Sequence, residues 1–388
     1  MICSTMPAFK ARIKRELQRR QELGLSRQVK EVNFGNCPVL EHGGETFLNF
    51  SSNDYLGLAC DDELRRAWQK GLEIYGCGSG ASPLVTGFSS AHAGLKSALC
   101  EWLGFESAVL FGSGFAANQA LIFGLLEKGD LLLQDKLNHA SLMEAGMLSP
   151  ATMKRFKHND VASLKALLTD DAFVITEGVF SMDGDLSPLA DIHAVVKEDS
   201  LLAVDDAHGI GVLGSEGQGS CHLAQITPDV LVVTFGKAFG LSGAAILCSE
   251  EMGDYLTQFA RHHVYSTAIP PSQAYALTHA VTMLQTQHWR REKLAELQHS
   301  FKENFSRFPG YVETVTPIKP VLLGDSHFAV KVSQALKSKG LWTTAIRPPT
   351  VPQGTARLRI TLTANHELSH IVSLAKNLEQ LLENGSIG

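Results

Sequence analysis

The sequence predicts an α/β protein with a mostly parallel, doubly wound sheet. Short apolar runs rich in Val, Ile and Leu recur through the middle of the chain, with helical segments between them. Such runs, bounded by Gly, Asp and Ser, are typical of strands buried on both faces. Their alternation with helices favours parallel pairing. The candidate strands are residues 108–111, 131–133, 173–176, 201–204, 230–234 and 243–248.

The flanking segments predict an N-terminal arm and a smaller C-terminal domain. Ile13 and Leu17 recur at helical spacing, which predicts a helix at about residues 7–23. We expect an arm over residues 1–45, a large domain over 46–285 and a small α+β domain over 286–388. The other expected elements are strands at 47–50, 312–315 and 358–361, a helix at 62–75, a loop at 76–87 and a long helical region from Pro271 to about Phe305.

Composition and charge argue against several classes of protein. The net charge of −6 leaves no global basic field to attract nucleic acid or an anionic membrane. The seven cysteines are odd in number and scattered, which disfavours both a disulfide framework and a zinc site, and we expect no metal. No apolar run approaches the roughly 20 residues of a membrane span, and no apolar signal core precedes the first charges. A cytoplasmic location is the expectation.

Polar residues follow five of the predicted strands at the point where each strand ends. In an open parallel sheet, ligands bind outside the carboxyl ends of the strands. We therefore expect these loops to form one site. They contain Gly112 to Gly114, then Asp135 and His139, then Glu177 and Ser181, then Asp205, Asp206 and His208, and finally Thr234 to Lys237.

The turn Gly112-Ser113-Gly114 leads from a predicted strand into a predicted helix. Small residues let backbone N–H groups approach an anion, and the helix N-terminus adds positive potential. The pattern therefore predicts a phosphate cradle. An ordinary strand-to-helix turn is an equally good interpretation of this motif taken alone.

Lys237 is the most informative single residue. It lies in Thr234-Phe-Gly-Lys-Ala-Phe-Gly240, just past an apolar strand and between two phenylalanines. A desolvated lysine amine has a lowered pKa, which makes it a competent nucleophile toward a carbonyl group. The alternative is a buried lysine paired with a carboxylate.

Asp205 and His208 follow the fourth predicted strand and add a carboxylate and an imidazole to the predicted site. A carboxylate at a strand end suits the protonated ring nitrogen of pyridoxal 5′-phosphate (PLP), and His208 follows three residues later. A metal site built from Asp and His is the rival interpretation, but no motif supplies a third ligand and Lys237 would have no role. The lysine, the carboxylate and the phosphate cradle together predict a PLP enzyme.

Two glycine patterns resemble dinucleotide-binding fingerprints but lack the required context. Gly209-Ile-Gly-Val-Leu-Gly214 is separated from its strand and leads into Gly, Ser and Gln, and Gly76-Cys-Gly-Ser-Gly-Ala81 follows a helix. Neither a Gly-x-Ser-x-Gly elbow nor a P-loop occurs in the sequence. A nicotinamide dehydrogenase is therefore disfavoured.

Four spaced motifs resemble the α-oxoamine synthases, PLP enzymes of fold type I that condense an amino acid with an acyl thioester and release CO₂. The motifs are Asn49-Phe-Ser-Ser-Asn-Asp-Tyr-Leu-Gly-Leu58, Thr176-Glu-Gly-Val-Phe-Ser-Met-Asp-Gly-Asp185, Val204-Asp-Asp-Ala-His-Gly209 and Thr234-Phe-Gly-Lys237. The resemblance covers residues 10 to 380. It implies a transferase acting as a homodimer with shared active sites.

The resemblance also implies a role for each matching residue. Lys237 would form the Schiff base with PLP, Asp205 would pair with the ring nitrogen, and His139 would stack on the ring. Further cofactor contacts would come from Gly114, Phe115, Glu177, Ser181, His208 and Thr234, and from Ser266 and Thr267 of the partner subunit. Asn53 and Arg359 would contact the substrate carboxylate, and Arg27, Arg347 and Thr350 would face the acyl substrate.

Finer details resemble the family members that join L-alanine to a pimeloyl thioester in biotin biosynthesis. These are Asn118-Gln119, Tyr265-Ser-Thr-Ala-Ile-Pro-Pro271, Ala345-Ile-Arg-Pro-Pro-Thr-Val-Pro352 and Gly354-Thr-Ala-Arg-Leu-Arg-Ile-Thr361. The acyl carrier stays open between coenzyme A and an acyl carrier protein. The alternative is a relative that uses glycine and acetyl-CoA. Arg19 and Arg20 compete with Arg27 for the acyl contact, and Asn138 stands before His139 where a serine is expected.

Overall fold

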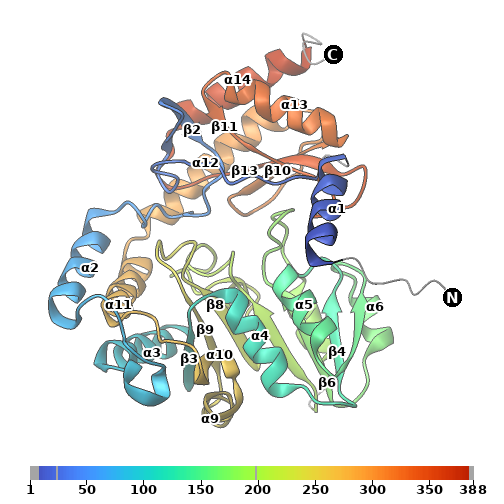
Figure 1. The fold of residues 1–388 in the computed structure, drawn as a ribbon. Helices are drawn as coiled ribbons and strands as arrows, with labels where there is room; N and C mark the ends of the chain where they lie inside the picture. The colour runs from blue at the N-terminus through green and yellow to red at the C-terminus, as the bar shows by residue number, and fades with distance from the viewer. Residues whose placement is uncertain (1–7, 23–24, 197–198, 384–388) are drawn as a thin grey trace.

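A seven-stranded sheet forms the centre of the larger body of the molecule (Figure 1). The computed structural model describes residues 8–22, 25–196 and 199–383. All neighbouring strands pair in parallel except at β9, which is antiparallel to both of its neighbours. In spatial order the strands are β3 (Ser107–Phe111), β9 (Ala244–Cys248), β8 (Val230–Thr234), β7 (Leu201–Asp205), β6 (Ala172–Glu177), β4 (Leu131–Asp135) and β5 (Thr152–Phe156).

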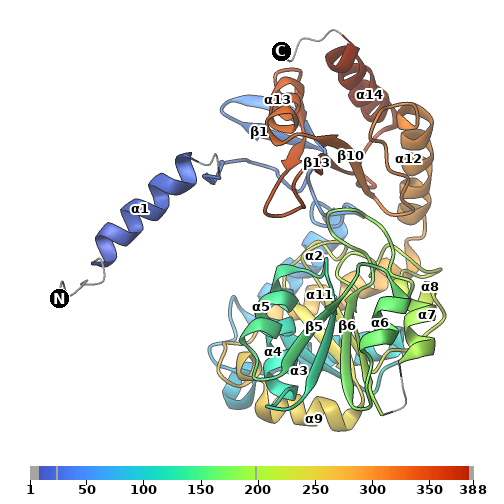
Figure 2. The ribbon, with the colours of Figure 1, turned by 90° about the vertical axis from the view of Figure 1, so that its right-hand side faces the viewer.

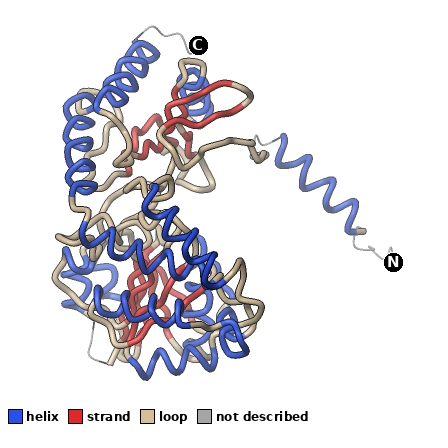
Figure 3. The backbone as a smooth tube through the Cα atoms, turned by 90° about the vertical axis from the view of Figure 1, so that its left-hand side faces the viewer, coloured by secondary structure: helices blue, strands red, loops and turns tan. Residues whose placement is uncertain are grey.

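Both faces of this sheet are buried, as the apolar runs predict. Along β8, Leu231 and Val233 belong to one core cluster, whereas Val230 and Val232 belong to another. Successive strand residues point to opposite faces, so helices must cover both. Figure 3 shows these strands enclosed by helices. The surrounding helices are α2 (Asp62–Tyr75), α3 (Ser90–Leu103), α4 (Gly114–Leu125), α5 (Ala140–Leu148), α6 (Val161–Leu167), α7 (Leu189–Val195), α8 (Ser220–Leu223), α9 (Glu250–Phe259), α10 (Arg261–Val264) and α11 (Pro271–Thr286).

The sequence prediction of this sheet is confirmed, apart from one strand. Each of the six candidate strands is present, with ends that differ by two residues at most. The edge strand β5 was not predicted, because Lys154 and Arg155 interrupt its apolar pattern. An edge strand tolerates such charges, since one of its sides faces solvent. The expected loop at 76–87 contains one further element, a π-helical turn at Pro83–Gly87.

The smaller body combines the C-terminal segment with residues from the start of the chain. One sheet has the order β10 (Ile318–Gly324), β13 (Ala356–Thr361), β12 (Thr344–Ile346), and another has the order β1 (Val39–His42), β2 (Glu45–Asn49), β11 (Leu341–Trp342). The helices here are α12 (Trp289–Phe305), α13 (Ser326–Lys337) and α14 (Leu368–Glu383). The pairing of β2 with β11 joins segments that are nearly 300 residues apart. The domain boundaries at 45 and 285 stay a prediction.

The strand expected at 312–315 is wrong. The strand in this region is β10, whose pairing with β13 begins where Ile318 faces Thr361. The pairing is antiparallel and Thr361 is the last residue of β13. Residues 312–315 come before Ile318 and therefore extend past the end of β13, with no strand beside them. Val315 is 61% exposed, which shows that its apolar character does not reflect burial in a sheet.

Helix α1 (Phe9–Glu22) extends away from both bodies (Figure 2). It has no buried residue, and Phe9, Ile13 and Leu17 are exposed on it. The ends of the predicted helix, residues 7 and 23, lie outside the described residues. Among the described helices, none is both long and apolar enough to cross a membrane.

The glycines of the loop after β7 have a packing role. Asp206 accepts hydrogen bonds from Ser220 N at 2.8 Å and Ser220 Oγ at 2.6 Å, which hold its carboxylate in place. A Cβ on Gly209 would lie 2.2 Å from Asp206 Oδ1, and a Cβ on Gly219 would lie 1.9 Å from Oδ2. No helix begins until Ser220, so this glycine pattern is no dinucleotide fingerprint.

We expect Gly209→Ala to destabilise the fold by about 1–3 kcal/mol, because the new methyl group overlaps a fixed, buried carboxylate. Urea unfolding monitored by circular dichroism measures this change. Gly78→Ala is the matched control, since nothing lies within 4 Å of its added Cβ. Equal stability of the two variants would contradict the packing role.

Candidate active site

Residues from the carboxyl ends of the parallel strands line one cavity of about 290 Å³. The structure therefore brings together most of the site residues that the sequence predicts. Those that line the cavity are Asn53, Gly114, Phe115, His139, Glu177, Asp205, His208, Thr234 and Lys237.

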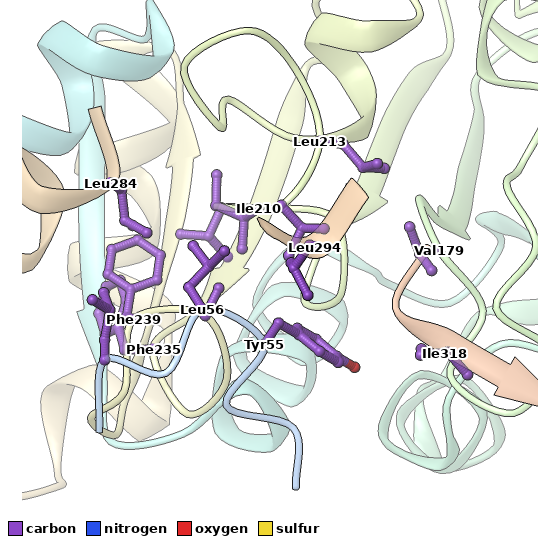
Figure 4. Packing of buried hydrophobic residues seen from close by; sticks show 14 of the residues in the cluster. Tyr55, Leu56, Val179, Ile210, Leu213, Phe235, Phe239, Leu284, Leu294 and Ile318 are labelled. Carbon is purple, nitrogen blue, oxygen red and sulfur yellow. The ribbon is translucent and has the colours of Figure 1, made fainter. Parts of the chain in front are cut away.

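Lys237 is held at the cavity wall by the packing of its neighbours. Phe235 and Phe239 are fully buried, with ring centroids 5.0 Å apart. Figure 4 shows these two rings packed beside Leu284 and close to Leu56. Lys237 Nζ lies 3.4 Å from Thr234 Oγ1. Burial lowers the pKa of the amine, although the charges of nearby carboxylates oppose this shift.

A chain of hydrogen bonds connects Asp205 with His139. Asn118 Nδ2 donates to Asp205 Oδ2 at 2.7 Å and to Ser141 Oγ at 2.9 Å. Ser141 Oγ lies 2.8 Å from His139 Nδ1, which also accepts a hydrogen bond from Ser141 N. Asp205 accepts a further bond from Ala207 N at 3.0 Å. The carboxylate and the imidazole are thus oriented by a common network.

Asp206 is separated from the cavity although it is adjacent to Asp205 in sequence. Successive strand-end residues point in opposite directions. Its carboxyl group therefore faces Ser220 on the other side of the loop. Burial, with a smaller contribution from the Asp205 charge, raises the pKa of Asp206 to about 7. Of these two carboxyl groups, only that of Asp205 lines the cavity and can contact a ligand there.

A second network joins His208 to Arg359. Tyr55 OH lies 2.5 Å from His208 Nδ1 and 3.4 Å from Asn53 Oδ1. Arg359 donates from Nη1 to Asn53 Oδ1 at 3.1 Å and from Nε to Ser181 O at 2.6 Å. Burial, together with nearby positive charges, holds the pKa of His208 well below its usual range, so the ring is neutral.

The helix N-terminus beside Lys237 fits a phosphate group. Ser113 Oγ accepts a hydrogen bond from Ala116 N, while the N–H groups of Gly114 and Phe115 have no partner within the helix. A Cβ on Gly114 would lie 2.4 Å from Thr234 Cγ2, so only glycine lets the turn approach β8 so closely. Backbone donors at the start of α4 suit an anion.

Unpaired buried atoms also indicate a polar ligand. Glu177 Oε1 and Asn118 Oδ1 are buried and have no hydrogen-bond partner among the described residues. Burial, reinforced by the Asp205 charge, raises the pKa of Glu177 well above its usual range. The phosphate cradle, the amine of Lys237 and the carboxylate of Asp205 together fit PLP.

The residues expected to face the acyl substrate lie in a different cavity of about 380 Å³. Arg27, Arg347 and Thr350 all line it, together with Arg20. Arg19 is absent from this lining and lies 3.4 Å from Glu16 in an ion pair. Of the three N-terminal arginines, two therefore remain candidates for the acyl contact.

Two expected cofactor contacts are not brought to Lys237 within one chain. Ser266 and Thr267 are exposed and line a separate cavity with His263 and Lys96. Their contribution from a partner subunit stays a prediction.

Asn138 stands where a serine was expected, and its amide is bonded through Nδ2 alone, because the buried Oδ1 has no hydrogen-bond partner among the described residues. Its Nδ2 donates to Ile175 O at 2.9 Å and to Gln134 Oε1 at 3.3 Å. These bonds tie the residue before His139 to β6.

Tyr55 and Ser141 are site residues that sequence reasoning missed. Tyr55 lies inside a motif that carries the family resemblance, which was a usable signal. Ser141 occurs in an ordinary helical segment, and only the fold reveals its contact with His139.

Comparisons with known proteins agree with this geometry. The chain matches the aminotransferase class I and II family over residues 45–378. It is 65% identical to an 8-amino-7-oxononanoate synthase from Vibrio atlanticus, covering 98% of this chain and 95% of that one.

Two solved structures share the fold. A serine palmitoyltransferase from S. paucimobilis with PLP and myriocin bound has a TM-score of 0.88 at 26% identity, covering 98% of this chain and 100% of that one. An 8-amino-7-oxononanoate synthase from Francisella tularensis has a TM-score of 0.78 at 28% identity, covering 88% and 99%. This chain is therefore a member of the aminotransferase class I and II family of PLP enzymes and, within it, of the 8-amino-7-oxononanoate synthases.

Proposed function

We propose that this protein condenses L-alanine with a pimeloyl thioester to give 8-amino-7-oxononanoate, CO₂ and the free thiol carrier, a step of biotin biosynthesis. The observation that carries this proposal is the cavity that unites Lys237, Asp205 and the α4 turn in a chain so similar to enzymes of that name. The arginines of the second cavity provide a separate region for the acyl substrate.

Different cavity residues would contact different parts of the cofactor. The N–H groups of Gly114 and Phe115 and the hydroxyl of Thr234 would hold the phosphate, and Asp205 would pair with the ring nitrogen. His139 would lie on the ring face, while His208 and Glu177 would surround its polar edge, and the family resemblance adds a contact from Ser181, which does not line the cavity. When bound, PLP supplies the electron sink that stabilises negative charge at the α-carbon of the amino acid.

Arg359 and Asn53 are placed to bind the carboxylate of alanine. Arg359 is nearly buried, and its hydrogen bonds to Ser181 O and Asn53 Oδ1 fix the direction of the guanidinium group. A planar guanidinium can make two parallel bonds to a carboxylate. This contact would orient the α-carbon toward Lys237.

Lys237 would move the proton at the α-carbon. Its lowered pKa increases the neutral fraction of Nζ, which can then accept the α-proton and later return a proton to the product. Thr234 Oγ1, 3.4 Å away, keeps this amine at the cavity wall.

The function is tested by one assay with three acyl donors. The purified protein receives alanine or glycine, each with pimeloyl, acetyl or palmitoyl thioester, and CO₂ and free thiol are measured. We expect release of both with the pimeloyl donor. Turnover only with glycine and acetyl thioester would overturn the substrate assignment, and CO₂ release without any thioester would overturn the condensation.

We expect Lys237→Ala to lower kcat by at least about 100-fold, because the variant lacks the amine that moves the α-proton. It should also lose the visible absorbance of lysine-bound PLP. Stopped-flow absorbance and steady-state rates measure the two effects. Lys165→Ala, in α6 and remote from the cavity lining, is the control and should retain both properties.

We also propose that the protein is a cytoplasmic homodimer in which Ser266 and Thr267 reach the partner's cavity. Support comes from their exposure and from their absence from the lining of their own chain's PLP cavity. The family resemblance favours the same arrangement.

Subunit complementation tests this arrangement. Lys237→Ala and Thr267→Val should each be impaired alone, and co-refolding the two should restore about a quarter of wild-type activity, because half of randomly paired dimers would hold one intact site. Activity is measured after isolation of the dimer by gel filtration. No recovery in mixed dimers of confirmed composition would show that each chain completes its own site.

A further inference from the structure

His158 joins three segments beside the cavity without lining it. It follows β5 in the chain, and its Nδ1 lies 3.0 Å from Asp135 Oδ1 at the end of β4. Its Nε2 lies 2.8 Å from Asp185 Oδ2, in the loop between β6 and α7. The ring also packs edge-on against Phe180, with centroids 4.4 Å apart.

Both ring nitrogens of His158 donate to carboxylates, so the ring is an imidazolium. A neutral imidazole has a single N–H and could satisfy only one of the two acceptors. Burial alone would lower the pKa of His158, but its hydrogen bonds to Asp135 and Asp185 and their charges raise it to about 10. Asp135 is fully buried, so its charge needs this partner.

The Asp135 side of the contact leads to His139. Asp135 Oδ1 accepts from Leu137 N at 2.8 Å, and Asp135 O accepts from Asn138 N at 3.2 Å. These bonds shape the short turn that places His139 at the start of α5. A displacement of Asp135 would therefore move the imidazole that faces the cavity.

The Asp185 side leads to Arg359. Residues 179–186 form a narrow hairpin, in which Val179 pairs with Leu186 and Phe180 N donates to Asp185 O at 3.1 Å. The same hairpin presents Ser181 O, which accepts the 2.6 Å bond from Arg359 Nε. The position of the guanidinium group thus depends on the hairpin that His158 holds.

We propose that His158 is a positioning residue, whose bonds to Asp135 and Asp185 lock the His139 turn to the Ser181 hairpin and so set the alignment of the cofactor ring with the alanine carboxylate. This inference rests on the proposed function for the identity of the amino acid. Its geometric part, the link between the two loops, requires only that the cavity binds PLP.

His158→Gln tests the proposal, with Asp185→Ala and the double variant completing a cycle. We expect His158→Gln to raise the PLP dissociation constant and the KM for alanine, and to lower kcat/KM by up to roughly 100-fold, because the catalytic groups shift against each other. The double variant should lose less than the sum of the two single losses, because both substitutions break the same bond between His158 and Asp185. His193→Gln, an exposed histidine in α7, is the control.

A purely structural role predicts a different result. In that case His158→Gln lowers the melting temperature but leaves the PLP dissociation constant and the KM for alanine like those of the control. That result would overturn the proposal, and so would a double variant whose loss in kcat/KM equals the sum of the two single losses. If His158→Gln fails to fold, Asp185→Ala decides by the same measurements, since it removes the bond from His158 to the hairpin, keeps the imidazolium on Asp135, and leaves the bond from Asn159 Nδ2 to Leu186 O in place.

Failure of the proposed function gives a separate signature. If the wild-type protein turns over alanine with no thioester, the reaction assigned above is wrong. PLP affinity and the absorbance change on adding alanine still compare the variants, so the positioning role is judged independently.

Discussion

Parallel pairing of strands that are buried on both faces is the constraint on which this molecule depends. Parallel strands must be joined by crossover connections, so every carboxyl end of β4, β6, β7 and β8 lies at the same edge. The antiparallel strand β9 leaves β3 running in the direction of β8, which adds the α4 turn to that edge. The PLP cavity is therefore a consequence of topology, and its residues come from segments spread over much of the chain.

Burial at this edge makes electrostatics strong and unpaired groups costly. Little solvent reaches this region, so the charge of Asp205 contributes to the raised pKa of Glu177 and opposes the lowering of the pKa of Lys237. The consequences differ between groups. Burial raises the pKa of Glu177 and lowers that of His208, so one environment favours the uncharged form of both groups.

The two bodies of the molecule meet through polar contacts with chemical consequences. Arg359 belongs to β13 of the smaller body, yet its bonds go to Asn53 Oδ1 and to Ser181 O above the large sheet. Arg357 of the same strand forms an ion pair with Asp183. The substrate carboxylate would therefore bind where the bodies join, and any movement between them would change its position. His158 extends the same coupling to the far side of the cavity.

The sequence alone determined the strands of the large sheet and the residues at their ends, because apolar patterning and turn chemistry are local properties. It placed Lys237, Asp205 and the Gly112–Gly114 turn in one site before any coordinate was known, since parallel topology leaves few other arrangements. It could not predict β5, whose charged residues are tolerated only because the strand lies at an edge.

Contacts between distant segments were decided by the tertiary structure. Three contacts join residues far apart in the chain: Tyr55 OH lies 2.5 Å from His208 Nδ1, β2 pairs with β11, and His158 contacts two carboxylates. The start of β10 at Ile318 is set by its partner strand β13. No local pattern encodes such contacts, because their free energy exists only when the packed core brings the segments together.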